Sequence, residues 1–208
     1  MEEEFHNHMR IPWHDYTRKS IGRPITEASL SEKASIIGRT GIMLLSCGTG
    51  AWRVRSSMNT LARELGITCT ADIGLLSIEY TCIDGGNCYT ESLCLFNTGV
   101  NTSKLYRMEE FVNKFAGNCK KMSGDELHTL LDRIHEIHGF YSPPFLGLAA
   151  AVACCAFTFL LGGGPVEMFC AFLGAGAGNY LRAKMNQHHL TLFLCTAASV
   201  ALACIVYT

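Results

Sequence analysis

The sequence predicts an α+β cytoplasmic domain, with helices packed on a three-stranded antiparallel meander, followed by an all-α transmembrane region of about three helices. Three observations predict it. Residues 1–141 hold 15 of the 17 Lys and Arg and 17 of the 18 acidic residues. The remainder contains three nearly uncharged apolar segments, and a stretch rich in β-branched and aromatic residues lies between residues 68 and 97. A membrane-spanning helix needs about 20 residues, with a lower limit near 17, so the apolar segments are interpreted as short spans.

Residues 1–28 are predicted to form a flexible N-terminal tail. They show no apolar periodicity, and Pro12, Gly22 and Pro24 interrupt them. The tail contains His6, His8 and His14, which we interpret as solvated side chains because their spacing fits no closed metal site. No metal ligand is therefore assigned in this segment.

Residues 29–141 are predicted to form the cytoplasmic domain, which begins with two helices. A helical pattern starts at Ser29, is interrupted at Cys47–Gly50 and resumes until Gly66, which provides a helix stop. The glycine pair within the interruption follows no strand and lacks the G-x-G-x-x-G spacing of a phosphate-binding loop. We interpret it as a kink or a close helix contact.

Three strands are predicted next, near residues 67–73, 75–83 and 87–96. Between the second and third strands, the sequence Asp-Gly-Gly-Asn at Asp84–Asn87 is typical of a tight hairpin turn. The helices before and after this meander are expected to cover its apolar face.

Two amphipathic helices are predicted after the strands. The first, LYRMEEFVNKFAG, ends at Gly117, and the second opens with a capping box formed by Ser123 and Glu126. The second helix carries three histidines, which we interpret as a polar face because no fourth metal ligand converges on them. They are His128, His135 and His138.

Residues 142–208 are predicted to be transmembrane, with helices at about 145–161, 166–181 and 190–207. The connection after the first apolar segment has no positive charge, whereas the connection after the second carries Arg182 and Lys184. The positive-inside rule places that second connection, and with it the N-terminal domain, in the cytoplasm. No signal peptide is expected before this domain, because three of the first four residues are acidic and no apolar run follows within the first thirty. The expected location is the cell (plasma) membrane, multi-pass.

The composition and motifs argue against several other classes of protein. The 11 cysteines are odd in number and form no C-x-x-C pair, so they are interpreted as small buried thiols in a reducing compartment. No basic run with interleaved aromatic residues is present, so a nucleic acid is not expected as a partner. No nucleophile elbow and no H-E-x-x-H motif occur, so no catalytic residue is assigned. No cofactor is expected.

Four segments carry a family resemblance through their order along the chain. They are Gly48–Ile67 (GTGAWRVRSSMNTLARELGI), Asn97–Asn101 (NTGVN), the Gly162–Gly164 turn and Asn179–Met185 (NYLRAKM). Together with the meander and the Pro-marked entry to the apolar region, they resemble the threonine/serine exporter family (ThrE/YjjP-like). The likeness covers roughly residues 32–208 and is greatest to the N-terminal half or the split small subunit.

The resemblance implies export of small polar acids, either threonine and serine or a dicarboxylate such as succinate, driven by an ion gradient. The family's first half usually has about five spans, whereas three are expected here. The resemblance therefore implies a truncated coding sequence or assembly in the lipid membrane, as a homo-oligomer or with a separate small membrane subunit. Arg55 and Thr98 depart from the family pattern, so no ligand contact is carried over to them.

Candidate site residues in the apolar region are those that are costly or unusual in a membrane. Glu167 is a proton-coupling candidate, or an interface residue near a helix N-terminus. Arg182 is a candidate ligand for a carboxylate or a topological anchor. The GAGAG sequence predicts close helix packing or an unwound segment that exposes carbonyl groups to substrate. The substrate-binding candidates are Asn179, Arg182, Gly174, Gly176, Gly178 and Thr196.

In the N-terminal domain, the candidates lie in the segments that carry the resemblance, namely Arg53, Asn97 and Asn101. Two other classes remain open. One is a membrane-anchored ligand-binding or regulatory module without transport activity of its own. The other is a membrane-bound hydrolase, which would depend on Ser56, Ser57 or Cys47.

Overall fold

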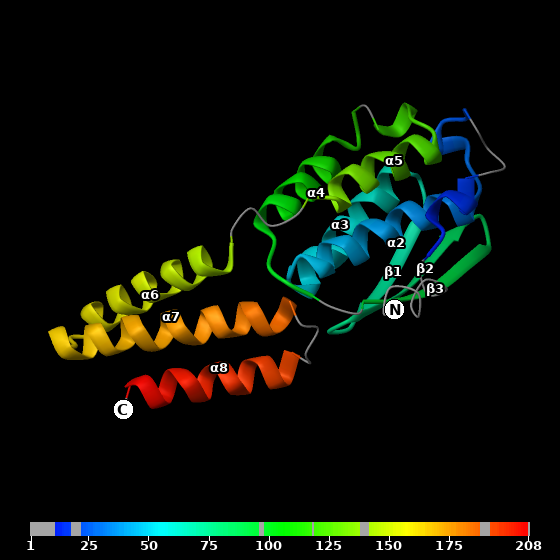
Figure 1. Ribbon diagram of the computed structural model, residues 1–208. Helices are drawn as coiled ribbons and strands as arrows, with labels where there is room; N and C mark the ends of the chain where they lie inside the picture. Colours follow the sequence, from blue (N-terminus) through cyan, green and yellow to red (C-terminus); the bar gives the residue numbers. More distant parts are fainter. Residues whose placement is uncertain are drawn as a thin grey trace. The chain divides into compact units, whose positions relative to one another are not determined.

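The computed structural model describes residues 11–17, 22–95, 98–117, 119–137, 142–187 and 192–207. The chain divides into two compact units, Met1–Gly139 and Phe140–Thr208. The N-terminal unit combines helices with a small sheet, whereas the described secondary-structure elements of the C-terminal unit are all helices (Figure 1).

The sheet of the N-terminal unit is an antiparallel meander in the order β1 (Thr68–Ile73), β2 (Ser77–Asp84) and β3 (Asn87–Cys94). Asp84 pairs with Asn87 across the hairpin turn. Gly85 and Gly86 have φ values of 55° and 90°, the left-handed conformation that a two-residue hairpin of this kind requires at both positions. The predicted meander and its hairpin are confirmed.

Four helices accompany the sheet in the N-terminal unit: α2 (Leu30–Ser46), α3 (Ala51–Glu64), α4 (Thr102–Lys114) and α5 (Gly124–His135). α2 and α3 lie on the sheet; α5 packs against α2, and α4 packs against α2, α3 and α5 (Figure 1). α2 is consequently enclosed, and every residue from Glu32 to Leu45 is buried. A helix covered on all sides has no solvent face on which to place a charge.

Local signals set the helix ends. The predicted capping box of Ser123 and Glu126 opens α5, and a second capping box, of Ser29 and Glu32, opens α2. Gly66, with φ 72°, follows α3 in the left-handed conformation expected of a helix stop. The interruption at Cys47–Gly50 separates α2 from α3 rather than kinking one helix.

Close contact between α2 and the sheet depends on Gly38. A Cβ atom at this position would overlap the ring and hydroxyl of Tyr80 on β2, which is almost fully buried. The Tyr80 hydroxyl donates a hydrogen bond of 2.7 Å to Glu91 on β3. The absent side chain therefore lets α2 lie directly on a buried tyrosine.

Part of the segment predicted as a tail packs on this unit. Trp13–Thr17 forms the 3-10 helix η2, and Ile25–Glu27 forms η3. Ile25 is fully buried in the core, and its neighbour Pro24 bridges to Ser123. The predictions for residues 1–10, including those for His6 and His8, lie outside the described residues.

The C-terminal unit contains α6 (Pro143–Leu160), α7 (Pro165–Gln187) and α8 (Leu192–Tyr207). α7 packs against both α6 and α8, so the three helices lie side by side with α7 in the middle (Figure 1). The turn between α6 and α7 includes Gly162 with φ 87°, a conformation that favours glycine.

The predicted fold class requires correction. Helices predominate over a small central sheet, and none of the helices in the described part of the chain is long and apolar enough to cross a membrane. α6 has 18 residues and α8 has 16, whereas a crossing needs about 20. α7 has 23 residues but carries Glu167, Arg182 and Lys184. The prediction of an all-α transmembrane region of three helices is wrong, because apolar composition does not guarantee sufficient uninterrupted length.

Candidate functional site: a buried polar network and a glycine-lined helix interface

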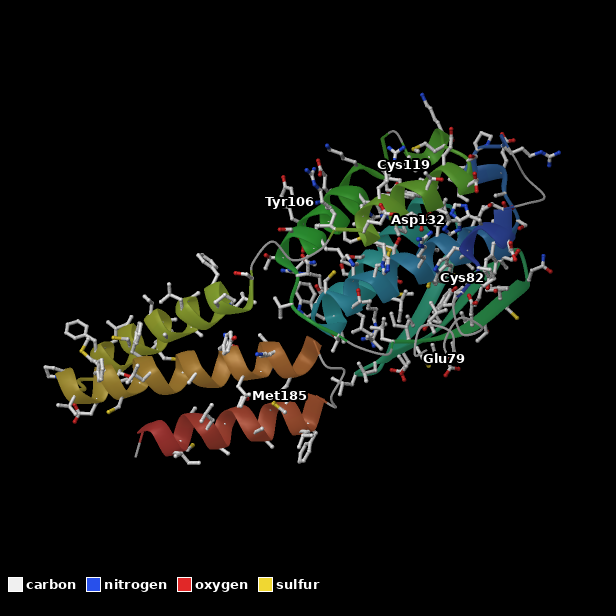
Figure 2. The ribbon with its side chains drawn as sticks, viewed as in Figure 1. Glu79, Cys82, Tyr106, Cys119, Asp132 and Met185 are labelled. Atoms are coloured by element: carbon white, nitrogen blue, oxygen red, sulfur yellow. The ribbon has the colours of Figure 1, made fainter. Side chains whose placement is uncertain are left out.

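A buried arginine organises the first candidate site. Arg39 on α2 is only 4% exposed, and its guanidinium pairs with the carboxylate of Asp132 on α5. Its Nη1 also lies 3.1 Å from the carbonyl oxygen of His128 and 3.2 Å from Nδ1 of the same residue. Figure 2 labels Asp132 in the region where α5 faces α2. A buried charge requires such partners, since desolvation without compensation is costly.

The hydrogen bonds of His128 define its tautomer. The Arg39 guanidinium can only donate, so Nδ1 of His128 must accept. The proton then resides on Nε2, which donates to the hydroxyl of Ser35 over 3.1 Å, and that hydroxyl donates to the carbonyl of Glu32 over 2.8 Å. The result is a series of hydrogen bonds that runs from Arg39 through the neutral imidazole of His128 and the Ser35 hydroxyl to the α2 backbone.

The electrostatic surroundings of His128 agree with that neutral state. Its side chain is fully buried, and burial, followed by the charge of Arg39, lowers the pKa of His128 to about 3. Charging this imidazole would place two cations side by side in a low-dielectric interior.

A second histidine has the opposite character. His14 on η2 is about half exposed, with Nδ1 2.6 Å from Asp125 and Nε2 2.8 Å from Asp132, both on α5. Hydrogen bonds to Asp125 and then to Asp132 raise the pKa of His14 above 6.5. Burial opposes ionisation of Asp132, but its hydrogen bonds to His14 and Arg39 together lower the pKa of that carboxyl. His14 therefore bridges two carboxylates as an imidazolium.

Three of these groups, His14, Arg39 and Asp132, line one side of an open pocket of about 760 Å³. Trp13 packs on the network, with its ring 6.0 Å from that of His128 and 5.6 Å from the Arg39 guanidinium carbon. Apolar residues form the rest of the wall together with further acidic and basic groups. The lining includes Ile42, Met43, Leu95, His135 and Glu136.

The pocket combines anionic, cationic and apolar surface, which suits a small polar molecule. No group of three or more His, Cys, Asp or Glu suited to a metal ion occurs in the part of the chain that the structure describes. Cys47 is buried, and burial raises the pKa of its thiol, the opposite of what an activated nucleophile needs.

His14 was predicted to be solvated and His128 to lie on a polar face, so the network that joins them was not predicted. One feature of the sequence did indicate a buried polar contact. Arg39 stands in the run IIGRTGIMLL, where no face of a helix is polar, so its charge had to find a buried partner. The position of His128 three residues before the buried Leu131 also places it on the inner face of α5.

The predicted candidates of the N-terminal unit lie elsewhere. Arg53 on α3 forms a surface ion pair of 2.9 Å with Glu109 on α4. Asn101 caps α4 by accepting from the Lys104 amide, and its side-chain amide donates to the carbonyl of Ile137. Both contacts join elements of the fold. Asn97 lies outside the described residues.

The second candidate site is the face of α7 that carries the GAGAG sequence. A Cβ atom on Gly174 would lie 2.9 Å from the carbonyl oxygen of Ala203, and one on Gly178 would lie 2.8 Å from that of Ser199. Both neighbours are backbone atoms of α8. Gly176 instead faces α6, where a Cβ atom would lie 3.1 Å from that of Ala151. The glycines therefore bring three helix backbones together within a regular helix, without an unwound segment.

The polar candidates of this unit are spread along it. The side-chain amide of Asn179 donates a 3.0 Å hydrogen bond to the carbonyl of Leu146 on α6, and Arg182 follows one turn later and is exposed. Glu167 is exposed in the first turn of α7, 15 residues before Arg182, which is about 22 Å at 1.5 Å per residue. Thr196 is exposed on α8. Glu167 and Arg182 are thus too far apart to hold the same small molecule.

A comparison with family models matches residues 35–208 to the ThrE model, described as "Putative threonine/serine exporter". The chain belongs to the threonine/serine exporter family. The match extends over most of both units and confirms the resemblance inferred from the order of motifs. The exporter family is one of transporters rather than enzymes, and it associates this chain with the membrane. No curated protein and no solved structure matches the chain.

Proposed function

We propose that this chain is a subunit of a plasma-membrane exporter of threonine and serine, driven by an ion gradient. The observation that carries the proposal is the family match, which includes most of the N-terminal unit and the whole C-terminal unit. In this proposal the charged N-terminal unit lies in the cytoplasm, where it receives substrate.

The surface of the C-terminal unit supports the proposal of a membrane location. Large apolar side chains on all three helices are exposed, and soluble monomers rarely expose contiguous apolar surface of this extent. Lipid or helices of another subunit would cover it at lower cost than water. These side chains include Phe157, Leu160, Phe169, Phe193, Val200 and Ile205.

The arrangement of α6, α7 and α8 supports a role as one subunit. α7 packs against both neighbours, so the described helices form a row. A row of three helices does not enclose a substrate pathway by itself. The pathway in this proposal is completed by further copies of the chain or by a separate small membrane subunit.

Asn179 and Arg182 are the residues proposed to contact substrate. They are three positions apart on α7 and so share one side of that helix. Arg182 would attract the carboxylate of the amino acid, and Asn179, which also donates a hydrogen bond to α6, would contact the substrate beside it. Gly174, Gly176 and Gly178 would set the helix spacing, whereas Glu167 and Thr196 lie apart from this pair.

The test is efflux of labelled threonine from loaded proteoliposomes that contain the purified chain, alone and with candidate partner subunits. Efflux that an ionophore abolishes is the expected result. Succinate and serine are tested in parallel, because a dicarboxylate is the alternative substrate. Absence of flux for all three, in every combination, would contradict the exporter.

The pocket of the N-terminal unit favours a second candidate, a ligand-binding or regulatory module without transport activity of its own. Its 760 Å³ volume and mixed charges suit a small polar ligand. Calorimetric binding of threonine by a chain that supports no flux with any partner would favour this candidate over the exporter.

A further inference from the structure

The short helix η2, Trp13–Thr17, which we call the strap, packs on the N-terminal unit and contacts three elements. His14 binds Asp125 and Asp132 on α5, and the Tyr16 hydroxyl donates a 2.6 Å hydrogen bond to Glu91 on β3. Trp13 packs over Arg39 on α2 and His128 on α5. These contacts hold a segment that is far in sequence from everything it touches.

Each nitrogen of the His14 ring points at a carboxylate oxygen, at 2.6 and 2.8 Å. An ionised carboxylate only accepts hydrogen bonds, so both nitrogens must carry a proton for both bonds to form. A neutral imidazole has one N–H. Loss of the second proton would therefore leave a nitrogen lone pair facing an anionic oxygen at hydrogen-bond distance, which is repulsive.

We propose that Trp13–Thr17 is a pH-sensitive strap, closed while His14 is doubly protonated and bridges Asp125 to Asp132, and released when that ring loses a proton. The titratable and charged groups around the ring are Asp125, His128 and Asp132 on α5, Arg39 on α2, and Asp15 on the strap itself; His135 and Glu136 line the same pocket.

The direction of the pH response follows from these neighbours. His14 has its pKa raised above 6.5, so its stabilisation of the closed strap is complete below about pH 6.5 and is lost as the pH rises through the raised value. Asp132 has its pKa lowered, so it remains an anion throughout that range. His128 stays neutral there, and Arg39 stays charged. Among His14, His128, Asp132 and Arg39, His14 is thus the group whose protonation changes within the near-neutral range.

Opening the strap would have a defined structural consequence. Trp13, His14 and Asp15 of the strap form one wall of the 760 Å³ pocket together with the two residues before them, and Trp13 covers the buried guanidinium of Arg39. Release would widen the pocket and expose a cation that is 4% exposed in the closed form. The inference depends on the N-terminal unit alone and not on the transported substrate.

The experiment uses the full-length chain with Trp52→Phe, which leaves Trp13 as the single tryptophan. Acrylamide quenching of Trp13 fluorescence is measured from about pH 5 to about pH 9, the range in which a histidine titrates. We expect weak quenching at low pH and a rise in quenching with a midpoint above 6.5. Asp125→Asn should move that midpoint down by about one unit, because it removes one carboxylate partner.

His14→Gln should abolish the transition and leave Trp13 accessible at every pH. His135→Gln is the matched control, because His135 lines the same pocket from α5 and should leave the midpoint unchanged. Hydrogen exchange of peptides from the strap, corrected for intrinsic rates, provides a second readout in the same variants, and melting curves exclude global unfolding. A transition that persists in His14→Gln, or quenching and exchange that do not vary with pH in the parent chain, would overturn the proposal.

Discussion

At the residue scale, the position of Arg39 in the middle of an enclosed helix dictates the protonation of its neighbours. Its guanidinium can only donate, so it fixes His128 as a neutral acceptor and Asp132 as an anion. His14, at the edge of the same cluster, faces carboxylates instead and takes the charged form. Two histidines 5.8 Å apart thus have opposite responses to pH.

The buried histidine should make the N-terminal unit sensitive to acid. The pKa of His128 falls from 6.5 in the unfolded chain to about 3 in the fold. Between these values the unfolded chain binds more protons, so acidification lowers the free energy of unfolding by up to about 1.4 kcal/mol per pH unit. Urea denaturation between about pH 6.5 and about pH 5 measures this slope.

Chains with and without His128 are compared in a His14→Gln background. The pKa of His14 is raised, so its effect on the free energy of unfolding opposes that of His128 and would mask part of the slope. In that background, His128→Gln should flatten the pH dependence between the two pH values. An equal slope with and without His128 would show that another group takes up the proton.

Arg182 allows a test of substrate recognition on α7. If its guanidinium meets the carboxylate of the exported amino acid, Arg182→Gln should raise the KM of export roughly tenfold, as loss of one charge-assisted hydrogen bond implies. Lys184→Gln is the control, since a residue two positions away points to another side of the helix. Equal effects of the two substitutions would favour a role of both cations as anchors.

At the element scale, glycines decide which helices and strands can touch. Gly38 lets α2 lie on the ring of Tyr80, and Gly174 and Gly178 let α7 lie on the backbone of α8. Close-packed interiors have little space to absorb an added methyl group, so these positions should be intolerant of alanine even though alanine favours helix formation.

Gly38→Ala should destabilise the N-terminal unit by roughly 1–3 kcal/mol, because the new methyl group would displace a buried tyrosine ring. Gly99→Ala serves as the control, since a Cβ atom at Gly99 meets nothing within 4 Å. Chemical denaturation measures both. Unchanged stability of the first variant would mean that α2 and the sheet can separate at little cost.

Gly178→Ala should destabilise the C-terminal unit by a similar amount, roughly 1–3 kcal/mol, because the obstacle is the backbone carbonyl of Ser199, which can move only with α8. Gly176→Ala should cost less, since its nearest neighbour would be the methyl group of Ala151 at 3.1 Å, and the nearest backbone atom, the carbonyl oxygen of Gly147, lies 3.7 Å away. Melting curves of the full chain in detergent compare the two variants. The reverse order would contradict close packing of α7 on α8.

At the scale of the whole molecule, the charges and the exposed apolar side chains are separated between the two units. The N-terminal unit has its own core, which extends from Ile25 to Ile134, and the C-terminal unit exposes most of its large apolar residues. The family match includes the greater part of both units. The two environments indicated by these surfaces, aqueous and apolar, are consistent with a transport protein at a membrane.

A chain that ends at Ile137 should therefore fractionate with soluble proteins, whereas the full chain should sediment with membranes. The physical reason is that apolar burial is worth about 25 cal/mol per Å², and among the described residues most of the large exposed apolar side chains belong to the C-terminal unit. Sedimentation of the shortened chain with membranes would show that the N-terminal unit has its own site of membrane attachment.

The sequence by itself determined the elements and the family. The Asp84–Asn87 hairpin, the capping box at Ser123 and the stop at Gly66 are local signals, and each was predicted because neighbouring residues create it. The order of motifs was sufficient for the threonine/serine exporter family. Local patterns of this kind need no knowledge of distant contacts.

Only the tertiary structure decided where the polar residues meet. Residues that lie more than 85 positions apart, such as Arg39 and Asp132, or His14 and Asp125, form ion pairs that no periodicity reveals. The tertiary structure also showed that Trp13–Thr17 forms a packed helix, and the lengths of α6, α7 and α8 showed that the predicted membrane spans were wrong. The reason is that a side chain's charge state and a helix's end depend on which partners the fold brings within a few ångströms.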